Sequence, residues 1–140
     1  MAKRHYSDVF NAGDHGTTYG GNPLATNVVY HVVGEISKPE FLARVREAST
    51  YFIAQLEALK SETGDAITSI KGQGLMIGID TKFQIKELLG ELLVAGLIAT
   101  QAGKNTLRLT PPLIISNAEI DEAVEKIRQV ITSKDLPCLT

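Results

Sequence analysis

Residues 13–23 combine four glycines with two threonine hydroxyls, which is the composition of an anion-binding loop. Glycine buries no side chain and loses much backbone freedom on folding, so this cluster indicates positive φ angles or close approach to another group. Asn22 and Pro23 then form a favourable N-cap and N1 pair for a helix. Backbone N–H groups and the hydroxyls of Thr17 and Thr18 could converge on a phosphate or carboxylate. A flexible lead-in to a capped helix remains an alternative.

Arg108 is the second candidate for chemistry. Period-2 alternation places Leu107 and Leu109 on one face of a short strand and the Arg108 side chain on the other. The planar guanidinium matches a carboxylate with two parallel hydrogen bonds, which lysine cannot do. The residues alone favour an ordinary solvated strand arginine, and a carboxylate site is the alternative.

Other kinds of site are not expected. The glycine loop lacks the Gly-Lys-Ser/Thr ending of a Walker A loop and follows no apolar strand, so it fits neither nucleotide motif. His5, His15 and His31 lack metal-ligand spacing, and Cys138 has no partner cysteine for a disulfide. A net charge of −2 without a basic stripe argues against nucleic acid, and no apolar run is long enough to span a membrane.

Helical periodicity organises the first half of the chain. Apolar residues at four-residue spacing predict a helix over residues 24–33 that stops at Gly34. Ser37 and Glu40 predict a capping box. It opens a second helix of about six turns that ends near Gly64.

The second half alternates pairs of strands with helices. Four short runs predict strands at residues 66–70, 75–79, 97–100 and 106–109. Turns at residues 71–74 and 101–105 join them in pairs. A helix over residues 83–95 separates the pairs, and a capping box of Ser116 and Glu119 opens the last helix. This order predicts an α+β fold, with a small, mostly antiparallel sheet and helices on one face.

Residues 15–25 resemble the His-Gly-Ser/Thr-Thr-Phe/Tyr-Gly-Gly-Asn-Pro-Leu-Ala segment of class III pyridoxal-phosphate aminotransferases. Two later stretches, residues 72–78 and 107–113, are similar in order and spacing. Acetylornithine and ornithine aminotransferases are the most similar enzymes. The resemblance covers nearly the whole chain but only the C-terminal part of such an enzyme. It implies the C-terminal small domain of fold-type I pyridoxal-phosphate enzymes.

The resemblance also implies roles for four residues. Arg108 matches the arginine that binds the substrate α-carboxylate and so orients the Cα–H bond. Thr18 matches the threonine that hydrogen-bonds the phosphate of pyridoxal phosphate in the neighbouring subunit's active site. Gly16 and Thr17 would assist through their backbone N–H groups. A turn residue that bonds its own backbone is the alternative for Thr18. No catalytic residue and no metal ligand is assigned.

In this family the Schiff-base lysine and the acid that pairs with the pyridinium nitrogen belong to the large domain, upstream of the glycine loop. No lysine in this sequence lies in such a motif, so we expect a fragment that is inactive alone. Residues 1–22 would be an arm and the phosphate loop, residues 23–135 the small domain, and residues 136–140 a tail. The expected partners are the large domain of the same enzyme and the second subunit of a homodimer.

Three function classes remain open. The first is part of an aminotransferase of arginine biosynthesis, with acetylornithine, then ornithine, then 4-aminobutyrate as amino donor and 2-oxoglutarate as acceptor. Its compartment would be the cytoplasm, or the mitochondrial matrix in a eukaryote. The second is a non-catalytic binding or interaction module whose loop holds a phosphate ligand. The third is a scaffold without any ligand, which needs only that the helices and sheet fold.

Overall fold

The computed structural model describes residues 14, 16–133 and 136–138, so most of the expected N-terminal arm lies outside the described residues. The chain divides into two compact units, residues 1–41 and residues 42–140. The first unit holds the glycine-rich loop and helix α2 (Pro23–Ile36). The second holds most of helix α3 (Pro39–Thr63), the sheet, and helices α4 (Ile85–Val94) and α5 (Asn117–Ser133).

Helix α2 begins as the sequence predicts. Asn22 is the N-cap, and its side-chain oxygen accepts hydrogen bonds from the backbone N–H groups of Leu24 at 2.9 Å and Ala25 at 3.2 Å. Pro23 occupies the first helical position, where its missing N–H costs nothing. The loop therefore leads directly into a capped helix.

The expected end of this helix is wrong. Gly34 keeps a helical backbone, and α2 continues to Ile36 because no residue before Ser37 leaves the helical region. The Ser37 N–H donates to the Val33 carbonyl at 3.0 Å, so Ser37 closes α2 rather than opening α3. No hydrogen bond joins Ser37 to Glu40 in the described part of the chain, and the capping box expected there does not form.

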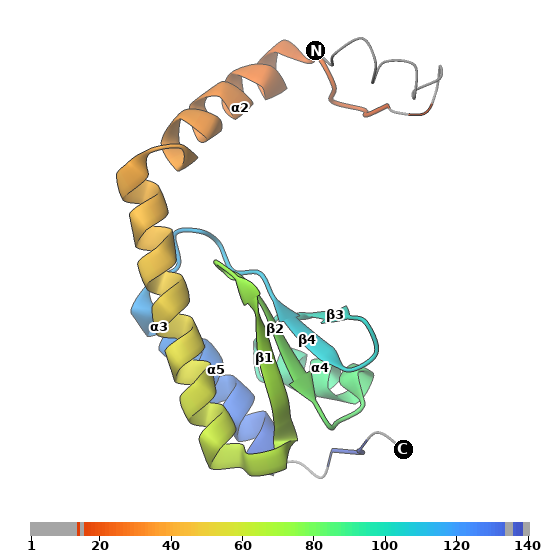
Figure 1. The fold of residues 1–140 in the computed structure, drawn as a ribbon. Helices are drawn as coiled ribbons and strands as arrows, with labels where there is room; N and C mark the ends of the chain where they lie inside the picture. Colours follow the sequence, from red (N-terminus) through yellow and green to blue (C-terminus); the bar gives the residue numbers. More distant parts are fainter. Residues whose placement is uncertain (1–13, 15, 134–135, 139–140) are drawn as a thin grey trace, which may run out of the picture. The chain divides into compact units, whose positions relative to one another are not determined.

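Four antiparallel strands form one sheet in the second unit, in the order β1-β2-β4-β3 (Figure 1). The strands are β1 (Ile67–Gln73), β2 (Met76–Thr81), β3 (Thr100–Ala102) and β4 (Thr106–Leu109). Helices α3, α4 and α5 cover one face of this sheet (Figure 1). A single 3₁₀ turn, Gly64–Ala66, connects α3 to β1. The predicted α+β fold is confirmed.

The core lies between the sheet and these helices. Its fully buried large side chains come from every covering helix and from three strands: Phe52, Leu56, Leu59, Ile67, Ile77, Ile79, Leu88, Leu92, Leu107, Ile120 and Ile127. Each buried side chain of this size contributes about 1.5–3 kcal/mol relative to full exposure. Apolar burial therefore holds the sheet against its helices, and the opposite face of the sheet carries the polar residues.

The structure moves the predicted boundaries of β1, β2 and β3, whereas β4 has the predicted ones. The β1–β2 turn contains only Gly74 and Leu75, so Lys71 and Gly72 lie in β1 rather than in the turn. Gly72 adopts φ +140°, a backbone conformation that glycine allows inside this strand.

Strand β3 starts at Thr100, three residues later than the sequence suggests. The preceding residues still close α4: the Leu97 N–H donates to the Leu92 carbonyl at 2.8 Å, and Gly96 has φ +80°. This is a Schellman ending with Gly96 as the C′ residue, and it takes Leu97 out of the strand.

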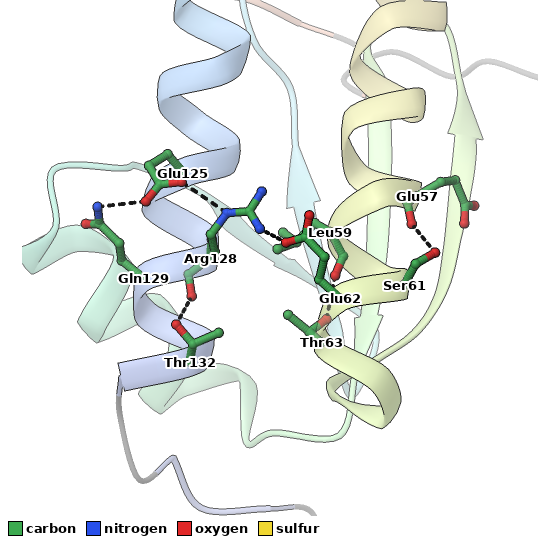
Figure 2. A network of polar contacts seen from close by, with 9 residues as sticks. All are labelled: Glu57, Leu59, Ser61, Glu62, Thr63, Glu125, Arg128, Gln129 and Thr132. Atoms are coloured by element: carbon green, nitrogen blue, oxygen red, sulfur yellow. Dashed lines mark hydrogen bonds and ion pairs between the residues drawn. The ribbon is translucent and has the colours of Figure 1, made fainter.

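An ion pair connects helices α3 and α5 at the polar edge of the core (Figure 2). Arg128 on α5 forms ion pairs with Glu62 on α3 and with Glu125 one turn earlier on α5. At the other end of α5, the Ser116 N–H donates to Glu119 at 2.8 Å, and the Glu119 N–H donates back to the Ser116 hydroxyl at 3.3 Å. The predicted capping box of α5 is confirmed.

No described helix is long and apolar enough to cross a membrane. The described residues also contain no group of three or more histidine, cysteine, aspartate or glutamate side chains that could hold a metal ion.

Candidate functional site

Arg108 lies on the sheet face that the helices leave open. Its strand neighbours Leu107 and Leu109 are buried, whereas Arg108 is exposed, as the alternation predicts. Across the sheet, Arg108 pairs with Gly78 in β2 on one side and with Thr100 in β3 on the other. Gly78 carries no side chain, and the Lys71 side chain of β1 lies over it, since a Cβ at Gly78 would be 3.4 Å from the Lys71 Cγ.

The guanidinium has one hydrogen bond and no acidic partner within the described residues. Its Nε–H donates to the Thr100 hydroxyl oxygen at 3.0 Å. Among the ion pairs of the described chain, none involves Arg108. An exposed arginine without a carboxylate partner keeps its terminal nitrogens available for an external carboxylate.

A hollow of about 460 Å³ lies beside Arg108 and Thr100. Apolar groups make up much of its wall: Phe52, Leu97, Ala99, Leu109, Pro111, Pro112, Ile115 and Ala123. Its charged side chains other than Arg108 already have partners, since Lys126 pairs with Glu122 at 2.7 Å and Glu119 caps α5. Of the two cations of this hollow, Lys126 pairs with Glu122, whereas Arg108 has no carboxylate partner within the described chain.

Asp80 lies on the same open face of the sheet and is the centre of a cluster of polar side chains there. Its carboxylate accepts hydrogen bonds from Ser69 at 2.6 Å, from Lys71 at 2.8 Å and from Thr106. These bonds, led by that of Lys71, lower the pKa of Asp80 to about 2. The cluster joins β1, β2 and β4, and Thr106 lies two residues before Arg108 on the same strand.

We expect Asp80→Asn to lose stability in a pH-dependent way. A carboxylate whose folded pKa lies near 2, against an ordinary 3.8, adds stability that is complete above pH 5 and fades as the pH falls through 2. The lowered pKa corresponds to about 2 kcal/mol. Urea denaturation of both proteins should show a gap of that order at pH 7 that narrows steadily between pH 4 and pH 2. A gap that stays constant over this range would contradict the role of the Asp80 charge.

The threonines of the glycine-rich loop differ in their hydrogen bonding. The Thr17 hydroxyl accepts the Tyr19 N–H at 3.2 Å, which is the local turn contact considered above for Thr18. The Thr18 hydroxyl has no hydrogen bond within the described chain, and neither do the N–H groups of Gly16 and Thr17. All three residues are exposed.

The start of helix α2 is less open to a ligand than its sequence suggests. Asn22 already accepts the N–H groups of Leu24 and Ala25, and the Thr26 N–H donates to the Asn22 carbonyl at 2.9 Å. The groups left for an anion therefore belong to the loop before the helix, including the Thr18 hydroxyl. Thr18 and Arg108 lie in different units of the structure.

Sequence reasoning missed Thr100 and Asp80. The register that places Thr100 opposite Arg108 depends on a three-residue connection at residues 103–105, whereas a five-residue turn was expected. A signal for Asp80 is present in the sequence, because its cross-strand partners Ser69 and Thr106 are also polar residues.

Comparison with known proteins agrees with this fold and these motifs. The family model for aminotransferase class III matches residues 1–131. The chain therefore belongs to the class III aminotransferases.

Acetylornithine aminotransferases are among its most similar relatives. The enzyme of Bacillus cereus is 39% identical over 127 residues, which are 91% of this chain and 33% of that protein. The Bacillus subtilis enzyme is 38% identical over 94% of this chain and 34% of its own length. The solved acetylornithine aminotransferase of Elizabethkingia anophelis superposes with a TM-score of 0.76 at 29% identity, over 96% of this chain and 36% of that one. The chain thus spans about a third of the length of the curated relatives it matches.

Proposed function

We propose that this chain is the C-terminal part of an aminotransferase that transfers an amino group from acetylornithine, or ornithine, to 2-oxoglutarate. In this proposal Arg108 binds the α-carboxylate of the substrate. The supporting observation is that Arg108 is exposed beside a hollow, without an acidic partner in the described chain. The family membership and the acetylornithine aminotransferase relatives support the reaction class and the donor.

The residues of the glycine-rich loop fit the phosphate of pyridoxal phosphate, the cofactor that the family implies. Thr18 would donate its hydroxyl, which has no hydrogen bond within the described residues, and Gly16 and Thr17 would donate backbone N–H groups. The Thr17 hydroxyl is already bonded to Tyr19 and is not assigned a phosphate contact. When bound, the cofactor supplies an electron sink for the pair released as the substrate Cα–H bond breaks.

Arg108 contributes orientation to this reaction. A carboxylate held by two parallel hydrogen bonds has little rotational freedom, so the Cα–H bond is presented in one direction. Apolar residues line the neighbouring hollow, and water displaced from it by a bound substrate would strengthen the electrostatic attraction between guanidinium and carboxylate.

The partners in this proposal are the large domain of the same enzyme and a second subunit. Helix α2 supports such partners because it is rich in apolar residues, none of which is buried. Its Leu24, Val28, Val29 and Val33 side chains are all exposed. A helix that is apolar around most of its surface is normally covered. We further propose that residues 1–22 belong with the large domain, residues 23–135 form the small domain, and residues 136–140 a tail.

We expect the isolated chain to show no transaminase activity, because no lysine in it matches the Schiff-base motif of the family. The purified protein should be mixed with pyridoxal phosphate, glutamate and 2-oxoglutarate, and amino-group exchange compared with cofactor alone. Exchange above that background would contradict the proposal that the chain is inactive by itself.

A chimeric enzyme tests whether the chain supports transamination when it is joined to a large domain. In it, the present chain replaces the matching C-terminal segment of the Bacillus subtilis acetylornithine aminotransferase, which is 38% identical to it. We expect the chimera to transaminate acetylornithine. A chimera that folds and holds the cofactor but has no activity would instead favour a non-catalytic binding module.

A further inference from the structure

The hydrogen bond between Thr100 and Arg108 has a consequence for the way a carboxylate can approach the guanidinium. Arginine binds a carboxylate either side-on, through Nε and one terminal nitrogen, or end-on, through both terminal nitrogens. In this structure Nε–H already donates to the Thr100 hydroxyl at 3.0 Å. The side-on approach therefore competes with Thr100, and the end-on approach does not.

We propose that Thr100 is a positioning residue for Arg108, which fixes the guanidinium so that its two terminal nitrogens face the substrate carboxylate end-on. This inference rests on the proposed carboxylate role of Arg108. It adds a residue of the edge strand β3 to the substrate site and specifies the geometry of binding.

Within the described residues, Thr100 is the residue that hydrogen-bonds the Arg108 guanidinium. The other cross-strand neighbour of Arg108 is Gly78, which has no side chain, and the Lys71 side chain that lies over Gly78 pairs with Asp80 instead. A long, exposed arginine side chain otherwise samples several rotamers, and the freedom it loses on binding weakens affinity. A hydroxyl acceptor at Thr100 removes part of that freedom before the substrate arrives.

The position of Thr100 is itself well defined. Thr100 pairs with Arg108 in the β3–β4 register, and both residues line the hollow of about 460 Å³. Threonine is also β-branched, so its χ1 angle has few alternatives in a strand. The acceptor oxygen is therefore held where Nε–H can reach it.

Thr100→Val tests the proposal because valine keeps the branched shape and removes the hydroxyl. In the chimeric enzyme we expect the KM for acetylornithine to rise roughly 3- to 10-fold with kcat nearly unchanged, the loss typical of one hydrogen bond. Thr100→Ser should restore the KM. Thr68→Val is the matched control, since Thr68 is an exposed threonine on the opposite edge strand β1, and its hydroxyl donates to the Asp80 backbone carbonyl at 3.2 Å.

A second measurement uses the 140-residue chain itself. The Nε–H resonance of Arg108 in NMR spectra should exchange with water several-fold faster in Thr100→Val than in the parent or in Thr68→Val. A merely structural role of Thr100 would change the melting temperature without this local signature.

The outcomes separate the two proposals. If Arg108→Lys raises the KM but Thr100→Val changes neither the KM nor the Nε–H exchange, the positioning role is overturned and the proposed function stands. If Arg108→Lys leaves the KM unchanged, the carboxylate role of Arg108 is overturned, and the positioning role with it.

Discussion

Gly72→Ala is expected to destabilise the second unit by about 2–4 kcal/mol, a large effect for a single methyl group. A Cβ atom at this position would lie 2.1 Å from the Met76 carbonyl oxygen and 3.0 Å from the Ile77 Cα. Both are backbone atoms of the partner strand, so relief requires that β1 and β2 separate. The φ angle of +140° adds strain for any residue with a side chain.

Gly90→Ala is the matched control for this prediction. Gly90 lies within α4, and a Cβ there would meet no atom within 4 Å. The same change should therefore stabilise the protein by about 0.5–1 kcal/mol through helix propensity. Urea denaturation midpoints measure both variants. Equal midpoints for Gly72→Ala and the parent would contradict the close β1–β2 approach.

Arg108→Lys is expected to have the largest effect on function. Lysine keeps the charge but replaces a two-pronged donor with a single ammonium group. If Arg108 holds the substrate carboxylate, kcat/KM in the chimeric enzyme should fall by about 1.5–3 kcal/mol, which is roughly 10- to 150-fold. The fold should tolerate the change because the Arg108 side chain is exposed and the core residues Leu107 and Leu109 are untouched.

Periodicity predicted most of the elements because the core of this protein is regular. The apolar stripes of α3 and α5 face the sheet as expected, and the alternation around Arg108 was read correctly. Capping chemistry was reliable where a side chain had one clear partner, as at Asn22 and at Ser116 with Glu119.

The errors arose where several local signals competed. Gly34 looked like a helix stop, yet a glycine ends a helix only when the chain takes a positive φ there. Ser37 looked like an N-cap, yet in the structure it closes the preceding helix. The turn before β2 was placed too early because Lys71-Gly72 reads as a turn, whereas its glycine serves a close strand contact.

The candidate site was predictable only in part. The sequence motifs identified Arg108 and Thr18 as candidates. The structure adds that the Thr17 hydroxyl has a local hydrogen bond. It also adds that the strand register places Thr100 beside Arg108. Register depends on turn length, and a two-residue error in turn length changes which side chains meet. Cross-strand partners of this kind need a three-dimensional structure.

The most direct test of the proposed function compares Arg108→Lys and Thr18→Ala in the chimeric enzyme, with the KM for acetylornithine and the dissociation constant of pyridoxal phosphate measured for each. Arg108→Lys should raise the KM and leave cofactor retention nearly unchanged, because the phosphate contacts are assigned to the glycine-rich loop. Thr18→Ala should weaken cofactor retention first and alter the kinetics only through it. If Arg108→Lys releases the cofactor and leaves the KM unchanged, the assignment of the two sites is wrong.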